Sequence, residues 1–484
     1  MKTQPNTDAG PLDVQGRGAF DVVIVGGGSA GAVLARRLTE DPVRKVLLLE
    51  AGEAYAPDHY PDVIANADHV GGDEKHDWGF TAHAGPLGRQ IRAPRGKVLG
   101  GSSGVNAAVA IRARASDFAK WTGRGLPGWS FPDVLETYKA LEHTRDGDDQ
   151  FRGRSGPLPV RQRTYGELTP ALRAFIDASV HQGFARVDDF NGGVQHGVGP
   201  YPLNVIAGIR PHTGIAYLSG EVRRRPNLMI RGRVEVDRVL INGRRATGVV
   251  CVDGSTYHAG DVILSAGTFG SAAILMRSGF SPADDLRRFD IEVVADFPVG
   301  QRLQDHPFSF NVYALQPECR AMSPAAGALV WTASSEAHHD ELDVHISATH
   351  LLDPAISPTG GAIILAIAIV QPDSVGTLCL RSRDPTAAPL IDYNFLAEAL
   401  DRRRMLESVK VSRQLGRDAA FAAVAPSEMV PGPDVRSDAA LEQAILAQLD
   451  SYQHATSTAP MGPEGAKAPS STPSARFTGS RSSA

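Results

Sequence analysis

The sequence predicts an α/β protein: a Rossmann-like domain with a mostly parallel sheet, and an α+β domain with an antiparallel sheet. The first indication is the stretch 20–52, where an apolar run, a glycine-rich turn, a helical pattern and a second apolar run follow one another. Asp261–Gly267 repeats this order, since a buried-strand pattern runs into glycine before a helical pattern at Thr268–Ser278. After residue 307, strand patterns follow one another mostly without helices, which favours an antiparallel sheet in a separate domain.

The glycine-rich turn has the pattern G-x-G-x-x-G, formed by Gly26, Gly28 and Gly31. It follows the apolar run Val22–Val25 and precedes the helical pattern Ala30–Leu38. Gly26 permits a tight turn that a Cβ would obstruct, Gly28 lets the backbone approach a pyrophosphate, and Gly31 lets the helix pack closely on the strand. The first turn of the helix offers unpaired N–H groups to phosphates. The alternative interpretation is an ordinary glycine-rich turn of an α/β protein.

The second apolar run, Val46–Leu49, ends on an acidic residue, Glu50. A carboxylate at the carboxyl end of this strand can accept hydrogen bonds from ribose hydroxyl groups. Strand, turn, helix, strand and acid therefore agree, and together they predict a dinucleotide-binding unit.

The middle of the chain indicates helices and a hairpin. Phe131–Glu142 has a helical pattern with Pro132 near its start. Leu228–Val239 and Ala246–Val252 alternate as β-strands do, and the turn Asn242–Gly243 lies between them, which predicts a hairpin.

The second domain is expected to contain strands followed by one long helix. A charged helical pattern covers about Ala397–Phe421. The strand candidates are Phe308–Leu315, Leu342–Ala348, Ala362–Val370 and Val375–Arg381.

The composition of the 484 residues, with 42% hydrophobic and 21% charged, is typical of a soluble globular protein. A net charge of −5 gives no indication of nucleic-acid binding. Cys251, Cys319 and Cys379 lie far apart without metal-site spacing, so we expect no metal site and a reducing cytoplasm. Residues 1–17 lack the apolar core of a signal peptide, and no apolar run reaches the roughly 20 residues that cross a bilayer.

Two further blocks are more specific than the glycine turn. One is Asp77–Asn106, with DWGF near its start and PRGKVLGGSSGVN at its end. The other is Ser265–Phe280, SAGTFGSAAILMRSGF, in which Ala272 stands where proline is common. With Gly26–Glu50, these blocks make residues 18–462 resemble the glucose-methanol-choline (GMC) oxidoreductases, a family of FAD-dependent alcohol oxidases and dehydrogenases that includes choline dehydrogenase-like flavoproteins.

The resemblance implies that Val98–Val109 is a second loop along the FAD pyrophosphate and flavin. In this loop Gly101 allows close backbone approach, and Ser102 offers hydroxyl and N–H groups. Some members attach FAD through a histidine just before the loop asparagine, but Val105 stands there, so we expect non-covalent FAD.

The resemblance also implies that the backbone of Val234 contacts adenine, and that Ala266 and Gly267 let the chain pass close to the dinucleotide. From the residues alone, Val234 would be an ordinary strand residue. The full set of expected FAD-binding residues is Gly26, Gly28, Ser29, Ala30, Gly31, Glu50, Ala51, Val98, Gly101, Ser102, Asn106, Ala107, Ala108, Val109, Val234, Ala266 and Gly267.

Catalysis in the family centres on a histidine in a block like H-x-x-x-T-x-x-M-G, which here is SYQHATSTAPMG with His454. The resemblance implies that His454, as general base, takes the proton of an alcohol hydroxyl while the adjacent carbon delivers hydride to flavin N5. An imidazole suits this role because its ordinary pKa lies near neutrality. The implied partners are a small-molecule alcohol, by default a primary one, and an electron acceptor that is oxygen, a quinone or a carrier protein.

The expected division of the chain follows from these blocks and from the changes in pattern. We expect a disordered leader at 1–17, a discontinuous FAD-binding domain at 18–115 and 200–306, connecting helices and loops at 116–199, a substrate-binding domain at 307–450, the catalytic histidine block at 451–462, and a low-complexity tail at 463–484.

The tail lacks family sequence, although family members normally continue with a second catalytic His or Asn and a strand–helix pair. The abrupt change resembles the product of a frameshift or premature ending, so we expect weaker FAD retention and low turnover. The alternatives are a catalytically impaired flavin-binding remnant, and a nicotinamide dehydrogenase on a Rossmann fold, which the second and third blocks disfavour.

Overall fold

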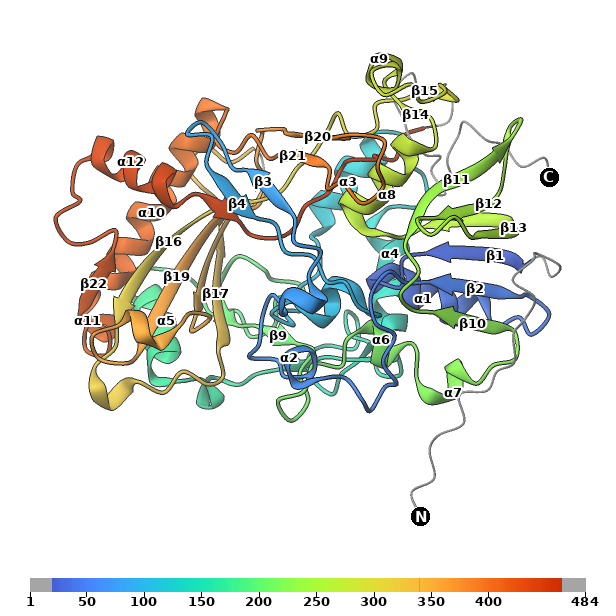
Figure 1. Cartoon of the computed structure of the whole chain (residues 1–484). Helices are drawn as coiled ribbons and strands as arrows, with labels where there is room; N and C mark the ends of the chain where they lie inside the picture. Colours follow the sequence, from blue (N-terminus) through green and yellow to red (C-terminus); the bar gives the residue numbers. More distant parts are fainter. Residues whose placement is uncertain (1–19, 339, 464–484) are drawn as a thin grey trace.

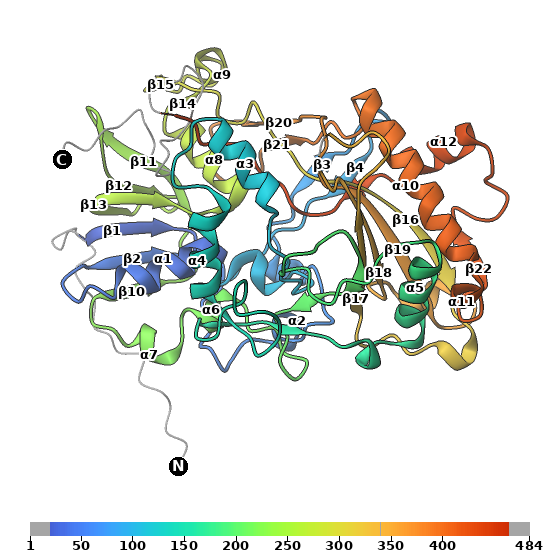
Figure 2. The same ribbon diagram turned by 180° about the vertical axis from the view of Figure 1, so that it is seen from behind.

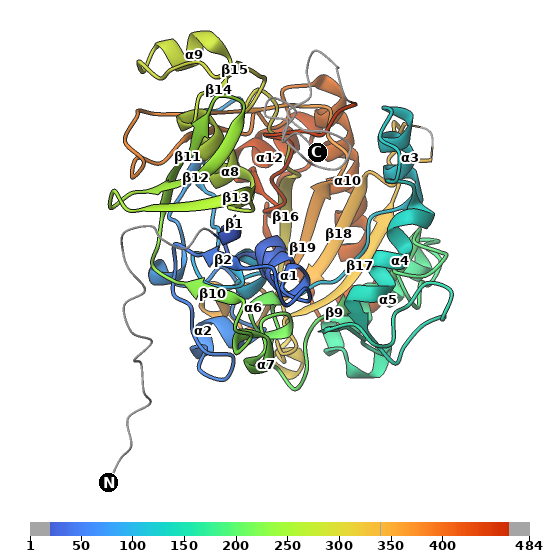
Figure 3. The same cartoon turned by 90° about the vertical axis from the view of Figure 1, so that its right-hand side faces the viewer.

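The computed structural model describes residues 20–338 and 340–463 and shows two large sheets toward opposite ends of the molecule (Figure 1). The expected leader lies outside the described residues, as does the expected tail except for Pro463. Helices α3 and α4 lie along one side of the molecule (Figure 3). The fold class predicted from the sequence is confirmed.

The first sheet confirms the predicted parallel core. Its strand order is β10-β2-β1-β13-β12-β11, in which β10, β2, β1 and β13 are parallel and β13, β12 and β11 are antiparallel. The strand predicted at Asp261–Gly267 is the end of β13, beside β1. The bounds are β1 Phe20–Val25, β2 Val46–Leu49, β10 Leu228–Arg231, β11 Val236–Asn242, β12 Arg245–Cys251 and β13 Thr256–Leu264.

The hairpin around Asn242–Gly243 is confirmed, but the β run Leu228–Val239 is divided in two. Its first part pairs with β2 and its second part with β12. Between them Arg233 has a φ of 59°, so the chain turns from one neighbour to the other. Alternation along a strand shows which side faces the core but not a change of partner, which is why the sequence did not predict this break.

Helices α1 and α8 cover opposite faces of the first sheet. Ala32 of α1 packs with Val22, whereas Ile274 of α8 packs with Val23, the next residue along β1. Because successive strand side chains point to opposite faces, β1 is buried on both sides, as a parallel sheet requires. The helices span Ser29–Leu38 (α1) and Gly267–Arg277 (α8).

The second sheet is antiparallel, as predicted, with the strand order β22-β16-β19-β18-β17-β8 and with β23 beside β16. Helices α5, α10 and α12 lie on its far side from the first sheet (Figures 1 and 2). The sequence analysis did not predict β8 or β17. The bounds are β8 Gly197–Pro200, β16 Pro307–Ala314, β17 Ala326–Thr332, β18 Val344–Thr349, β19 Ala362–Ile369, β22 Ser427–Val430, β23 Asp450–Ser451, α5 Pro170–His181, α10 Ala399–Arg417 and α12 Asp438–Gln448.

The strand expected at Val375–Arg381 forms, but in another sheet. It is β20, which pairs with β21, and β21 pairs with β3, a strand from the first hundred residues of the chain. Backbone bonds between Leu303 and Gly376 direct this segment away from β19. This sheet contains β3 Thr81–His83, β4 Gln90–Arg92, β20 Thr377–Cys379 and β21 Leu390–Asp392.

Short elements connect these parts. The helix predicted at Phe131–Glu142 is confirmed as α4, and the long charged helix is α10, which Asp418 separates from α11. Other bounds are α2 Asp62–Ala65, α3 Ala115–Gly123, α4 Phe131–Leu141, α6 Thr213–Ala216, α7 Gly220–Arg223, α9 Ala283–Arg287, α11 Ala419–Ala422, β5 Glu142–His143, β6 Leu158–Pro159, β7 Arg161–Gln162, β9 Pro202–Leu203, β14 Phe280–Ser281 and β15 Ala295–Asp296, with 3-10 turns at Glu74–His76, Gly101–Gly104, Tyr165–Glu167, Pro317–Cys319 and Pro354–Ile356.

Within residues 20–338 and 340–463, no helix combines the length and the apolar character that crossing a membrane demands. The same residues contain no cluster of His, Cys, Asp and Glu able to hold a metal ion. The cysteines at 251, 319 and 379 are free thiols.

Candidate active site

A cavity of about 580 Å³ opens where strands β1, β2 and β13 end. The carboxyl ends of parallel strands are the usual place for ligands in open α/β sheets. The expected FAD-binding residues that line the cavity are Gly26, Gly28, Ser29, Ala30, Glu50, Ala51, Gly101, Ser102, Val234, Ala266 and Gly267.

Two helices begin at this cavity. The N-caps of α1 and α8 are Gly28 and Ala266, and neither provides a side-chain cap. The first N–H groups of a helix have no partner within the helix, and the helix dipole adds partial positive charge there. The cavity therefore has two sets of N–H donors suited to the phosphates of a dinucleotide.

Glycine lets the backbone segments around the cavity approach one another. Gly26 has a φ of 94°, and a Cβ on it would lie 2.7 Å from the backbone of Ala266. A Cβ on Gly101 would lie 2.7 Å from the Cα of Gly28. Gly31 lies outside the lining, where a Cβ would lie 2.0 Å from the Gly26 carbonyl oxygen, so it serves the packing of α1 on β1.

Glu50 lies buried at the end of β2, with 5% of its surface exposed. Its two carboxylate oxygens accept hydrogen bonds from the N–H groups of Gly27 and Gly52, each at 2.8 Å. Burial raises the pKa of Glu50 to about 7, although these hydrogen bonds and Lys97 act in the opposite direction. Each oxygen retains a lone pair, so the carboxylate can also accept from a ribose hydroxyl.

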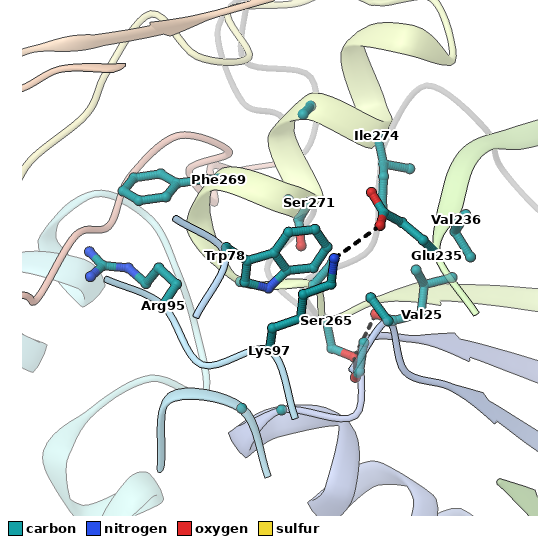
Figure 4. Close-up of a pocket in the computed structure, with 18 of the residues that line it drawn as sticks. Val25, Trp78, Arg95, Lys97, Glu235, Val236, Ser265, Phe269, Ser271 and Ile274 are labelled. Atoms are coloured by element: carbon teal, nitrogen blue, oxygen red, sulfur yellow. Dashed lines mark hydrogen bonds and ion pairs between the residues drawn. The ribbon is translucent and has the colours of Figure 1, made fainter. Parts of the chain in front are cut away.

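Side chains from distant segments complete the cavity wall (Figure 4). Lys97 Nζ lies 3.3 Å from the Glu235 carboxylate and 4.2 Å from the centre of the Trp78 ring. The guanidinium of Arg95 lies 4.8 Å from the centre of the Phe269 ring. The wall thus offers aromatic faces and positive charge, both of which suit a flat anionic cofactor.

The remaining expected FAD residues, Val98 and Asn106–Val109, do not line this cavity. Val98 is fully buried, and Ala108 has a φ of 57°, with its N–H donating to the Asn106 side chain at 2.9 Å. Arg210 anchors this loop. Its fully buried guanidinium donates hydrogen bonds to the carbonyl oxygens of Asn106 and Ile64.

Val234 lies in the cavity wall, but its backbone N–H is already used. This N–H donates to the Glu50 carbonyl oxygen at 2.9 Å. If the Val234 backbone forms a hydrogen bond with adenine, we therefore expect its carbonyl oxygen to be the group that does so.

His454 lies outside the cavity lining, in a segment held by the residues before β16. Its backbone N–H donates to Asp305 at 2.8 Å, and its ring centre lies 5.3 Å from that of His306. The neighbouring Gln453 accepts a hydrogen bond from Arg95 at 2.7 Å. Since Arg95 lines the cavity, it connects the histidine block to the expected cofactor site.

The surroundings of His454 favour its neutral form. Its ring is accessible, yet the protein packed around it lowers its pKa, and the charge of Arg95 lowers it further, while Asp305 acts in the opposite direction. A neutral imidazole at neutral pH has a free lone pair and can accept a proton.

The residues present fit FAD. The cavity joins two uncapped helix N-termini, a close passage between Gly28 and Gly101 that a side chain would fill, and a buried carboxylate at the end of β2. These groups match the pyrophosphate and the ribose of a dinucleotide.

Sequence reasoning assigned no role to several lining residues. Trp78, Arg95 and Lys97 lie inside the specific block 77–106, so that block was the signal that could have found them. Glu235 and the segment 385–389 reach the cavity only through the tertiary fold, and no local pattern marks them.

Comparisons with known proteins agree with this geometry. A GMC oxidoreductase family model matches residues 20–308, and a second one matches 372–470, which is past the expected end of the resemblance at 462. The chain is 35% identical to the oxygen-dependent choline dehydrogenase of Burkholderia mallei, over 92% of this chain and 84% of that one. It is 34% identical to the enzyme of the same name from Paraburkholderia phymatum, over 92% and 83%.

Solved structures show the same fold. Pyridoxine 4-oxidase from Mesorbium loti superposes with a TM-score of 0.84 at 31% identity, covering 92% of this chain and 90% of that one. A variant of the formate oxidase of Aspergillus oryzae superposes with a TM-score of 0.86 at 23% identity, covering 95% and 92%. The expected family and, through it, the FAD cofactor are confirmed. The chain belongs to the GMC oxidoreductase family.

Proposed function

We propose that this protein oxidises the CH–OH group of an alcohol to a carbonyl, with FAD held non-covalently in the cavity and His454 as the general base. Family membership supports the reaction class. The observation that carries the assignment of His454 is its position: it is held by Asp305, favours the neutral state, and is joined through Gln453 and Arg95 to the cofactor cavity.

The chain's own groups would hold the cofactor. The N-termini of α1 and α8 would bind the pyrophosphate, and Glu50 the ribose. Val105, buried in the second loop, has no nucleophilic atom, which supports non-covalent binding. When bound, FAD supplies the acceptor for the hydride that leaves the substrate carbon.

His454 would accept the hydroxyl proton as the carbon–hydrogen bond breaks. Thr458, four residues on, donates through its hydroxyl to the Thr268 carbonyl oxygen at 2.8 Å, and Thr268 donates to the Ala455 carbonyl oxygen at 2.7 Å. These reciprocal bonds fix the histidine block against the start of α8, at the cofactor cavity. A base held in this way gains rate through orientation as well as proton transfer.

The test is anaerobic reduction of the bound flavin by primary alcohols. His454→Asn should lower the reduction rate by about 10² to 10⁴-fold and leave flavin content unchanged. The matched control is His59→Asn, at an exposed histidine paired with Asp58, which should react like the parent protein. In the parent, the rate should fall as pH drops through the lowered pKa of His454, because the protonated imidazole cannot accept a proton.

Two results would overturn the proposal. Equal rates in the parent and His454→Asn would remove the general-base role, and bound flavin that no alcohol bleaches would support the non-catalytic remnant instead. Reoxidation with oxygen, a quinone or a carrier protein would identify the acceptor.

A further inference from the structure

The second sheet has an inner face, turned away from helices α5 and α10. Every second side chain along these strands, for example Ile346 and Ile367, points to the opposite face and packs in the core with those helices. On the other side, the centre of the Phe308 ring lies 5.6 Å from that of Tyr452, which lies 5.4 Å from that of His454. The inner face comprises Phe308, Phe310 and Val312 of β16, Ile364, Ala366 and Ala368 of β19, His345, Ser347 and Thr349 of β18, and Leu329 and Trp331 of β17.

Apart from Asp450 of β23, which the register places opposite Phe308 at the sheet edge, the inner face carries no Asp, Glu, Lys or Arg side chain. Its one titratable imidazole is that of His345, which burial, with the charge of His454 as a second cause, shifts to a pKa of about 3. His345 is therefore neutral at physiological pH, and its ring meets that of Trp331 edge-on at 4.9 Å. Away from the edge at Asp450, the face offers rings, methyl groups and hydroxyls, and no counter-charge.

The first carboxylate that borders this face, Asp305, is fully engaged. It accepts hydrogen bonds from the Ser451 hydroxyl at 2.7 Å and from the backbone N–H groups of His454 at 2.8 Å and His306 at 2.7 Å. It also lies 3.9 Å from the guanidinium of Arg95. A substrate cation would have to compete with four existing partners for this charge.

The second carboxylate, Asp450, lies across from Phe308 at the sheet edge. It accepts a hydrogen bond from the Ser451 N–H at 2.7 Å. Burial raises its pKa, and the charge of Asp305 adds to this, while the Ser451 N–H and the charge of Arg89 act in the opposite direction, so this carboxyl ionises less readily than an exposed one.

The site as a whole disfavours positive charge. Burial lowers the pKa of both His306 and His454; for His454 the charge of Arg95 acts in the same direction and that of Asp305 in the opposite one. Aromatic rings alone attract a cation only weakly, whereas burying a charge without a partner is costly.

We propose that the substrate is an uncharged alcohol with an aromatic or branched apolar group, which packs on the inner face while its hydroxyl meets His454. The inference rests on the proposed function, since it names the substrate class of that site. It also implies that the substrate of this chain differs from choline, the quaternary ammonium alcohol in the name of its relatives. Phe308 and Phe310, which are only partly buried, would flank the apolar group.

The test compares choline with 3,3-dimethylbutan-1-ol, which has the same shape and lacks the charge, and with benzyl alcohol. Anaerobic reduction of the bound flavin should show kcat/KM for both neutral alcohols at least about tenfold above that for choline. Choline reacting as fast as its neutral isostere, or faster, would overturn the inference. If choline then lost its advantage in Asp450→Asn, the edge carboxylate would be identified as its counter-charge.

A matched pair of variants tests the face itself. His345→Asp and His345→Asn have side chains of nearly equal size that differ in charge. The Asp variant should raise the ratio of choline to 3,3-dimethylbutan-1-ol activity by about tenfold over the Asn variant. An unchanged ratio in two flavin-containing variants would mean that His345 does not face the substrate, which contradicts the inference. If either variant fails to fold, the isostere comparison in the parent protein decides.

Calorimetric titration distinguishes failure of this inference from failure of the proposed function. If no alcohol reduces the flavin, the oxidation is wrong, but 3,3-dimethylbutan-1-ol should still bind the flavin-loaded protein more tightly than choline does. Tighter binding of choline, or no binding of either compound, would overturn the substrate class as well.

Discussion

The cofactor cavity and the inner face of the second sheet are built in different ways. In the cavity, the groups expected to hold the pyrophosphate and the ribose depend mainly on backbone: helix N-termini, glycine turns and the N–H groups that hold Glu50. The inner face is made of side chains from the four consecutive strands β16, β17, β18 and β19. Backbone contacts tolerate little change, whereas side chains can be exchanged without altering the sheet. One fold can thus keep its cofactor while its substrate changes.

The largest expected effect comes from a substitution that weakens FAD binding in the cofactor cavity and leaves the inner face unchanged. In Gly28→Ala the new Cβ would lie 3.7 Å from the Gly101 Cα, so the protein accommodates it, but it occupies the passage meant for the pyrophosphate. We expect FAD affinity to fall by about 100-fold, roughly 2.7 kcal/mol, with an unchanged melting temperature of the apoprotein. Gly166→Ala, where nothing lies within 4 Å of the new Cβ, is the control. Unaltered FAD affinity would place the pyrophosphate elsewhere.

Glu50→Gln tests the cofactor cavity through the pH dependence of the protein's stability. The folded-state pKa of Glu50, about 7, lies above its ordinary 4.5, so ionisation opposes folding of the apoprotein. The stability that Glu50 contributes is therefore complete below pH 4.5 and is lost as pH rises through 7. Between pH 5 and 8, the unfolding free energy of the apoprotein should fall by about 2 kcal/mol more than that of Glu50→Gln. Chemical denaturation at both pH values measures this, and parallel profiles would contradict it.

The same contrast explains how much the sequence could predict. Gly26, Gly28 and Glu50 lie in one short strand–turn–helix–strand unit, so local spacing was enough to predict the parallel sheet and its cavity. The break at Arg233 and the change of sheet at β20 depend on which partner a strand meets, and alternation carries no such information. The inner face is harder to predict from the sequence, because Phe308, His345 and Trp331 become neighbours only through the register of β16, β19, β18 and β17.

A smaller effect is expected in the substrate half. The hydroxyl of Tyr452 shares a hydrogen bond of 2.5 Å with that of Ser347, on the inner face. Tyr452→Phe keeps the ring against Phe308 and removes this bond, which should lower kcat/KM about fivefold, roughly 1 kcal/mol, without a change in FAD affinity. Steady-state kinetics and flavin titration of one preparation give both values. A parallel loss of FAD would show that the two halves are not independent.

Lys97→Met is expected to have the smallest effect and to measure what side chains add to the backbone-built half. Lys97 is partly exposed and already paired with Glu235 at 3.3 Å, so solvent and its partner both weaken its charge toward a cofactor phosphate. FAD affinity should fall only about twofold at low salt and not at all at high salt. Glu235→Gln, which frees the ammonium, should strengthen binding by a similar factor. A tenfold or larger loss in Lys97→Met that persists at high salt would mean that Lys97 binds FAD directly, and the cavity would then depend on side chains as the inner face does.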